Sequence, residues 1–157
     1  MSHPIEVFFS SHHPLAGRIK ADFAGSSGTV VKVRLAAYDG LVQDAAAGTL
    51  HPAFATILLD SIMGGSVMGR LEKLVPIATV GLTVNHLRSP LAAEAIHGEA
   101  VCVSVHNDLA YVNGTLWDAD GTPIAIASGT FMIGTRGTSI RSRDKGQDEG
   151  NGKESRI

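Results

Sequence analysis

The chain has a single cysteine, few aromatic residues and almost no net charge. Cys102 is the only cysteine among 157 residues, which excludes an intramolecular disulfide and a cysteine-based zinc site. Aromatic residues make up 5% and the formal net charge is −2, so neither base stacking nor overall charge favours a nucleic-acid partner. Cys102 lies in an apolar run between Val101 and Val103, which indicates a small buried thiol.

The start of the chain lacks a basic segment followed by an apolar one. The sequence therefore shows no signal peptide, and we expect a cytoplasmic protein. One apolar run, 52–69, has the length of a membrane span, but Asp60 at its centre, three glycines and the lack of a second such run argue against a membrane protein. A content of 44% hydrophobic and 18% charged residues is typical of one globular domain with a sizeable core.

What the sequence does contain is one apolar helix and a series of segments of period two. Residues 52–71 predict a helix that is apolar nearly all round and therefore buried. Before it, the pattern predicts a short helix closed by Pro14 and Gly17, a hairpin formed by "RIKADFA" and "TVVKVRLAA", and a loop, "YDGLVQDAAAGTL". After Pro76, four segments predict long strands: "IATVGLTVNHLR", "AEAIHGEAVCVSVH", "LAYVNGTLWD" and "TPIAIASGTFMI", the last two joined by the turn "DADG".

These elements predict an α+β domain over residues 1–134, in which a long antiparallel sheet wraps around one central buried helix. The exposed edges of such a sheet favour pairing with a second copy, so we expect a homodimer or a homotetramer.

Residues 135–157 lack periodic apolar side chains and predict a disordered tail. The histidines show no tight ligand spacing apart from His12 and His13, so no metal site is expected.

Asp60 is the only charged residue between Pro52 and Gly69. None of the residues three or four positions away carries a positive charge, and burying an unpaired carboxylate costs several kcal/mol. Such a carboxylate tends to mark a functional site. The alternative is a structural aspartate satisfied by Ser61, Thr56 or backbone groups.

The stretch "GTLHPAFATILLD" resembles the phenylacetate-degradation (PaaI-like) branch of the hotdog-fold acyl-CoA thioesterases. In that family, Gly-x-Leu-His-Gly-Gly is followed by a carboxylate nine residues after the histidine, and His51 and Asp60 have this spacing. "VNHLRS" and "WDADGTPIAIASGTFMI" resemble the strand motif and the last hairpin of the family, so the resemblance runs from about Leu15 to Ile133. It implies a hotdog fold and hydrolysis of a small or medium acyl-CoA, with coenzyme A as part of the substrate and no separate cofactor.

The resemblance also implies roles for four residues. Asp60 would be the nucleophile or the general base, and His51 would shape the turn and hydrogen-bond near the thioester. Asp44 stands where one branch of the family has an asparagine that orients water or the thioester, and Thr79 where relatives carry a water-positioning hydroxyl. The alternatives are a plain helix-entry histidine, a solvated loop acid and an ordinary strand threonine.

The largest departure from the family is Pro52, which replaces the glycine whose N–H binds the thioester carbonyl. Proline has no N–H, and loss of one such donor typically lowers the rate about 10²- to 10³-fold. The N–H of Ala53 or Phe54 could replace it, because the first turn of a helix leaves several N–H groups free.

The phosphates of coenzyme A would need cations, and the matching turn, "VHNDLAY", has no lysine or arginine. Arg88 is the best candidate, followed by Arg70 and Lys73 at the helix end, with Ser89 and His86 as further ligand contacts. The alternative is that His86 is a strand histidine that faces solvent or a partner.

The sequence is compatible with three functions. The first is an acyl-CoA thioesterase. The second is a non-catalytic hotdog protein that binds acyl-CoA or only dimerises, which Pro52 and the missing turn cation favour. The third is a hotdog hydratase or dehydratase that uses His51 and Asp60, although the thioesterase spacing of these two residues argues against it.

Overall fold

The computed structural model describes residues 4–8, 10, 21–27, 30–35, 41–92 and 95–134. Its elements are α1 Pro4–Val7, β1 Ala21–Ser27, β2 Val30–Leu35, β3 Val42–Asp44, β4 Thr49–Leu50, α2 Ala53–Leu71, β5 Ile77–His86, β6 Ile96–His106, β7 Leu109–Trp117 and β8 Pro123–Ile133. The predicted tail and the predicted end of the first helix lie outside the described residues.

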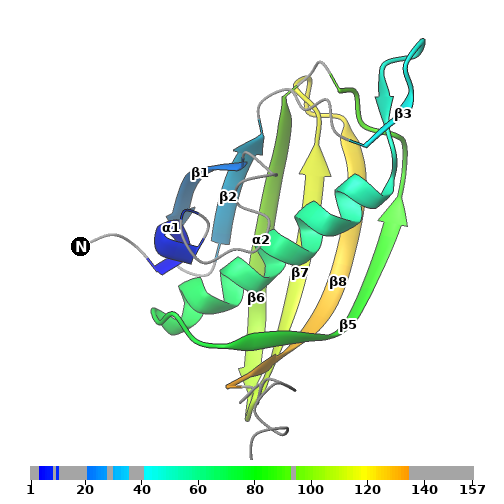
Figure 1. Cartoon of the computed structure of the whole chain (residues 1–157). Coiled ribbons are helices and arrows are strands. Elements are labelled where there is room, and N and C mark those ends of the chain that lie inside the picture. Colours follow the sequence, from blue (N-terminus) through cyan, green and yellow to red (C-terminus); the bar gives the residue numbers. More distant parts are fainter. Residues whose placement is uncertain are drawn as a thin grey trace, which may run out of the picture.

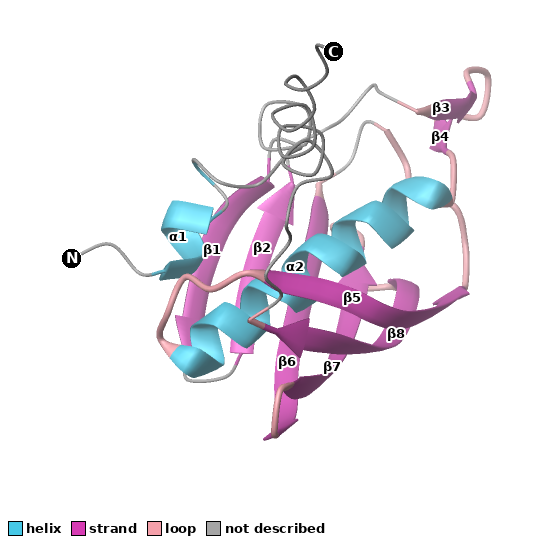
Figure 2. Cartoon of the chain, turned by 60° about the horizontal axis from the view of Figure 1, so that its bottom comes forward, coloured by secondary structure: helices cyan, strands magenta, loops and turns pink. Residues whose placement is uncertain are grey.

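Six strands form one antiparallel sheet in the order β1-β2-β6-β7-β8-β5. The helix α2 crosses one face of this sheet diagonally, from the end of β5 towards α1 (Figure 1). The view in Figure 2 shows β5 passing along the side of α2, as the last strand of the sheet. The predicted architecture, a long antiparallel sheet around one central helix, is confirmed.

The helix α2 is buried because it is apolar on every side. Its first charged residue after Asp60 is Arg70, at the end of the helix, and the chain leaves the helical conformation at Glu72 with a φ of 52°. The helix side chains that lie within the hydrophobic core are Phe54, Ala55, Leu58, Leu59, Ile62, Met63 and Val67. Burial of this many apolar side chains, and not charge pairing, holds the helix on the sheet.

Two strand glycines allow α2 to lie close to the sheet. A Cβ on Gly98 of β6 would be 3.0 Å from the Cδ1 atom of Ile62 and 2.9 Å from a methyl group of Leu116. A Cβ on Gly114 of β7 would be 3.0 Å from Leu59 and Met63 of the helix. We call this contact region, Gly98 and Gly114 against α2, the helix seat.

The predicted loop before α2 contains a small hairpin, β3–β4, so this part of the prediction was wrong. The hairpin is held by residues far away in the sequence: the N–H of Leu50 donates to the carbonyl of Pro90, and that of Ala92 to the carbonyl of Gly48. Strands of two and three residues are too short to show an alternating pattern, which is why the sequence alone predicts a loop.

Candidate active site

The carboxylate of Asp60 lies about two turns into α2, on the side that faces β5. The Thr79 hydroxyl of β5 donates a 2.7 Å hydrogen bond to Asp60 Oδ1. Asp60 is half-buried and not fully buried as the sequence suggested, because it faces the outermost strand of the sheet. Ser61 donates to the Ile57 carbonyl within the helix, so it is not the partner of Asp60.

A β-bulge turns Thr79 towards the helix. In the register of β5 with β8, Thr79 is paired with Phe131, and the next pair is Gly81 with Thr130, so Val80 is an extra residue. Phe131 is buried beneath α2, and Thr79 lies on the same face, whereas the side chain of Val80 is 58% exposed. Bulges re-aim side chains in this way near active sites.

A second polar pair lies one helical turn before Asp60. Thr56 Oγ1 and His86 Nε2 are 3.2 Å apart, and His86 is the last residue of β5. Thr56, Asp60, Thr79 and His86 together form what we call the β5 side of α2. Thr56 was not among the site residues expected from the sequence, although its spacing of four residues from Asp60 was a usable signal.

At the start of α2, every backbone N–H of the first turn already has an acceptor. The N–H of Ala53 donates to His51 Nδ1 at 3.1 Å, and the N–H of Phe54 donates to the His51 carbonyl. The next two N–H groups donate to the carbonyl of Pro52. The two N–H groups that the sequence offered as replacement donors are therefore engaged, while the His51 side chain is exposed.

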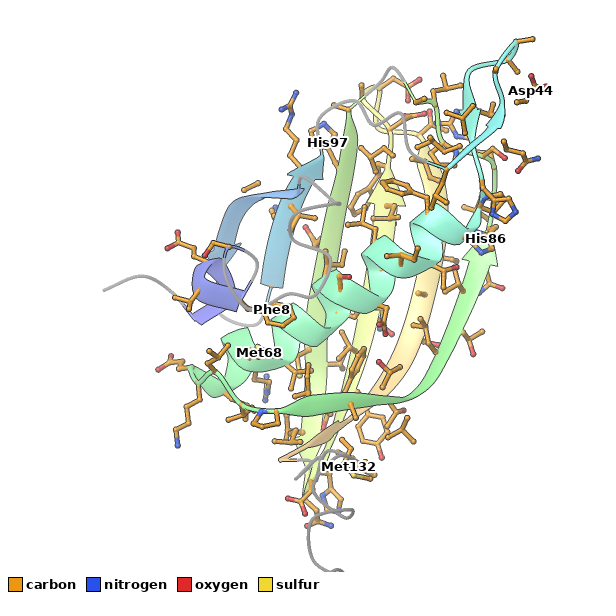
Figure 3. All side chains as sticks on the ribbon, viewed as in Figure 1. Phe8, Asp44, Met68, His86, His97 and Met132 are labelled. Carbon is orange, nitrogen blue, oxygen red and sulfur yellow. The ribbon has the colours of Figure 1, made fainter. Side chains whose placement is uncertain are left out.

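Asp44 does not lie with Asp60. Its Oδ1 atom accepts hydrogen bonds from the N–H groups of Ala46 and Ala47, at 2.9 and 3.0 Å, which stabilises the turn between β3 and β4. Figure 3 shows Asp44 on this hairpin, beyond the start of α2, and His86 beside the first turns of the helix.

Arg88 is paired within the chain. Its guanidinium forms an ion pair with Asp118, which is only 4% exposed, and donates to the carbonyl of Thr122 at 3.3 Å. Hydrogen bonds from Thr122 also hold the pKa of the exposed Asp120 carboxyl below its usual value. Ser89 is half-buried beside Arg88 in the segment that follows β5.

The remaining candidates lie elsewhere. Arg70 and Lys73 are exposed at the far end of α2. Cys102 is buried as predicted, and burial raises the pKa of its thiol although Arg70 opposes this shift.

Within the described ranges, no three His, Cys, Asp or Glu side chains gather in a way that could hold a metal ion. No helix in the described part of the chain has the length and apolarity to cross a membrane.

In a comparison with known families, residues 2–133 match the acyl-CoA thioesterase C-terminal domain. No curated protein matches the chain. Among solved structures, E. coli PaaI from the phenylacetic acid degradation operon is 10% identical with a TM-score of 0.71, over 82% of this chain and 88% of that one.

Two streptococcal structures are also similar. A hypothetical thioesterase from Streptococcus pneumoniae, solved with coenzyme A, is 15% identical with a TM-score of 0.64, and it has also been solved with an aspartate or a threonine replaced by alanine. A Streptococcus mutans protein bound to acetyl-CoA is 18% identical with the same TM-score. Both likenesses cover 72% of this chain and 87% of the other. These similarities confirm the predicted hotdog fold.

Proposed function

The chain belongs to the acyl-CoA thioesterase family, and we propose that it hydrolyses the thioester bond of a small or medium acyl-CoA. The observation that carries the proposal is the Asp60 carboxylate, half-buried on the β5 side of α2 with a hydroxyl as its hydrogen-bond partner. The coenzyme A and acetyl-CoA bound by the two streptococcal proteins support an acyl-CoA as the ligand.

In the proposed reaction, Asp60 acts as a general base on water. The water oxygen bonds to the thioester carbon while its proton passes to the carboxylate, and the C–S bond then breaks to release coenzyme A, which takes up a proton, and a carboxylic acid. The Thr79 hydroxyl donates its hydrogen bond to Oδ1 of Asp60, and Oδ2 is then the oxygen that accepts the proton from water. The Thr79 oxygen can accept a hydrogen bond from the same water, and this favours the general-base role over direct attack by Asp60.

The proposed site is built from two chains. From Ala53 to Asp60 the helix rises about 10 Å, so groups at the helix start and Asp60 of one chain cannot contact one thioester. Among the described strands, β5 pairs only with β8, and its other edge of ten residues is unpaired. An edge of this kind favours a homodimer that brings the helix start of one chain to Asp60 of the other.

A non-catalytic acyl-CoA-binding protein is the second candidate, and one observation favours it. Pro52 has no N–H, and the N–H groups that follow it are engaged within the helix start. If no other donor stabilises the oxyanion, binding would occur without turnover.

The experiment that separates the candidates combines hydrolysis and binding. Thiol release is followed with a panel of acyl-CoAs from acetyl to decanoyl and with aryl acetyl-CoAs, and affinity is measured by calorimetry with coenzyme A. Turnover that depends on Asp60 supports the thioesterase, whereas binding without turnover supports the second candidate. Single turnover in ¹⁸O water labels the product when water attacks directly, whereas label in Asp60 requires a mixed anhydride that water opens at the Asp60 carboxyl carbon. Sedimentation giving one chain mass would contradict the two-chain site.

A further inference from the structure

The proposed hydrolysis contains one proton transfer that still lacks a donor. When the C–S bond breaks, its electron pair goes to sulfur, and coenzyme A leaves more readily if an acid protonates that sulfur. In the proposed reaction Asp60 takes a proton from the attacking water, so a second group that carries a proton to the sulfur would complete the site.

The described side chains near the start of α2 offer few acids. Asp44 is an acceptor bonded to the turn of its own hairpin, and the Arg88 guanidinium is paired with Asp118. The threonine hydroxyls on the β5 side of α2 are too weak as acids. Two histidines remain, His51 and His86, and imidazole is the side chain that most often transfers protons near neutral pH.

The two histidines differ in the group that holds them. Nδ1 of His51 accepts the N–H of Ala53, and this contact is lost when the ring takes up a second proton, because a backbone N–H can only donate. Nε2 of His86 lies 3.2 Å from Thr56 Oγ1. A hydroxyl both donates and accepts, so Thr56 can bond to the neutral and to the protonated ring. The hydrogen bond of His86 therefore survives a proton transfer.

The other ring nitrogen of His86 is accessible to a ligand. The ring is exposed, and Nδ1 has no hydrogen-bond partner among the residues that the structure describes. Thr56 is the fourth residue of α2, about 4.5 Å along the axis from Ala53, and His86 lies beside these first turns (Figure 3). In the proposed two-chain site, the chain that brings its helix start to Asp60 of the other chain therefore brings its own His86 as well.

We infer that His86 is the general acid that protonates the sulfur of the leaving coenzyme A, opposite the Asp60 of the other chain that activates water. This inference rests on the proposed thioesterase function, and it gives His86 a chemical role beyond the ligand contact expected from the sequence.

The ring starts as imidazolium, with its Nε2–H donated to Thr56 Oγ1 and its Nδ1–H directed at the sulfur. As the C–S bond breaks, the electron pair stays on sulfur and the Nδ1 proton moves to it, which leaves a neutral ring and a free thiol. The proton that Asp60 took from water returns to solvent, and solvent reprotonates His86. The net reaction is thioester and water giving carboxylic acid and thiol.

The test varies how much the leaving group needs a proton. A thiophenol leaves as a stable thiolate near neutral pH, whereas an alkyl thiol such as coenzyme A is a weaker acid and depends more on a proton donor. kcat/KM is measured with the acyl-CoA that the wild type hydrolyses fastest and with the phenyl thioester of the same acyl group.

His86→Gln places an amide near the position of Nε2, where it can still bond to Thr56, but it has no proton to transfer. We expect kcat/KM to fall about 10- to 100-fold for the acyl-CoA and less than about threefold for the phenyl thioester. His97→Gln is the matched control, because His97 is also an exposed strand histidine but lies on β6, with β7 and β8 between it and β5. It should change neither rate.

Equal losses with both thioesters would overturn the inference, because binding or folding would then explain the effect of His86→Gln. An unchanged rate with the acyl-CoA would also overturn it and would mean that Asp60 returns its own proton to the sulfur. In both cases, hydrolysis that requires Asp60 leaves the proposed function standing. If the wild type hydrolyses neither thioester, the proposed function fails and the inference fails with it.

Thr56 is a positioning residue in this scheme, since it acts through the ring of His86. We expect Thr56→Val to lower kcat/KM about fivefold for the acyl-CoA and to leave the phenyl thioester unaffected, because one neutral hydrogen bond orients the ring. Thr56→Ser should recover the rate. A loss shared by both thioesters would contradict the positioning role and would mean that the pair only holds α2 against β5.

Mixed dimers test which chain supplies the acid. A heterodimer of Asp60→Asn and His86→Gln chains has one intact site if each site combines Asp60 of one chain with His86 of the other. A one-to-one mixture would then recover about a quarter of the wild-type activity on the acyl-CoA. A mixture that is no more active than the average of its two parent homodimers would overturn the inference, because the position of His86 at the thioester follows from the helix start of the other chain.

Discussion

The two sides of α2 are held by different forces. At the helix seat, Gly98 and Gly114 have no side chains, so Ile62 and Leu59 pack directly against the sheet, and the atoms nearest to these glycines are apolar. On the β5 side, the helix meets the strand through Thr56–His86 and Asp60–Thr79 hydrogen bonds. The seat provides stability, and the β5 side keeps a carboxylate accessible at an open edge, which stability alone would not favour.

Two aspartates sharpen this comparison. Asp118 is buried and has the environment that stabilises a buried charge: the Arg88 guanidinium and the N–H of Thr122. Asp60 is half-buried with a neutral hydroxyl as its partner, and none of the lysines and arginines that the structure describes forms an ion pair with it. Asp118 therefore has the environment of a structural carboxylate, whereas we propose that Asp60 takes part in the chemistry.

The largest effect is expected from Asp60→Asn, which removes the charge from the β5 side and keeps the shape. We expect kcat to fall at least about 10²-fold, as for loss of a general base or nucleophile, while the free energy of unfolding changes little. Steady-state thiol release and urea unfolding measure the two quantities. Near-normal turnover would remove Asp60 from the mechanism.

The seat is tested with Gly98→Ala, in which the new Cβ would lie within 3.0 Å of Ile62 and Leu116. We expect the free energy of unfolding to fall by about 2 kcal/mol, because overpacking displaces the helix. Gly81→Ala in β5 is the matched control: no atom lies within 4 Å of its Cβ, so stability should stay level or rise slightly. Equal losses in both variants would mean that close packing does not distinguish the two sides.

Arg88→Gln tests the second aspartate. Removal of the guanidinium leaves Asp118 buried without its cation, and we expect a loss of about 1 to 2 kcal/mol in the free energy of unfolding, reduced by the partial exposure of Arg88. The KM for acyl-CoA should stay the same, because this cation is already paired. Arg70→Gln, at the exposed helix end, is the comparison for KM. A rise in KM with unchanged stability would instead assign Arg88 to the coenzyme A phosphates.

The smallest effect is expected from Thr79→Val, which keeps the shape and removes the hydrogen bond to Asp60. We expect kcat to fall roughly tenfold, since one neutral hydrogen bond orients the carboxylate. Thr79→Ser keeps the hydroxyl and should recover most of the activity. If valine and serine behave alike, the hydroxyl has no part in the reaction.

The sequence by itself determined the large elements. An eighteen-residue run with a single charge predicts a buried helix, and the structure has α2 at Ala53–Leu71. The four period-two segments after Pro76 became β5 to β8, because long alternating strands carry their own pattern. The His51–Asp60 spacing, which is local in the chain, was enough to suggest the family.

Only the tertiary structure decided the contacts of the site. The extra residue Val80 turns Thr79 towards Asp60, and a bulge is set by pairing with β8 that no pattern in β5 reveals. The sequence likewise does not reveal that the Ala53 N–H donates to His51 or that Arg88 pairs with Asp118. Each depends on the direction of a side chain or N–H group within a few ångströms, and sequence spacing does not specify direction.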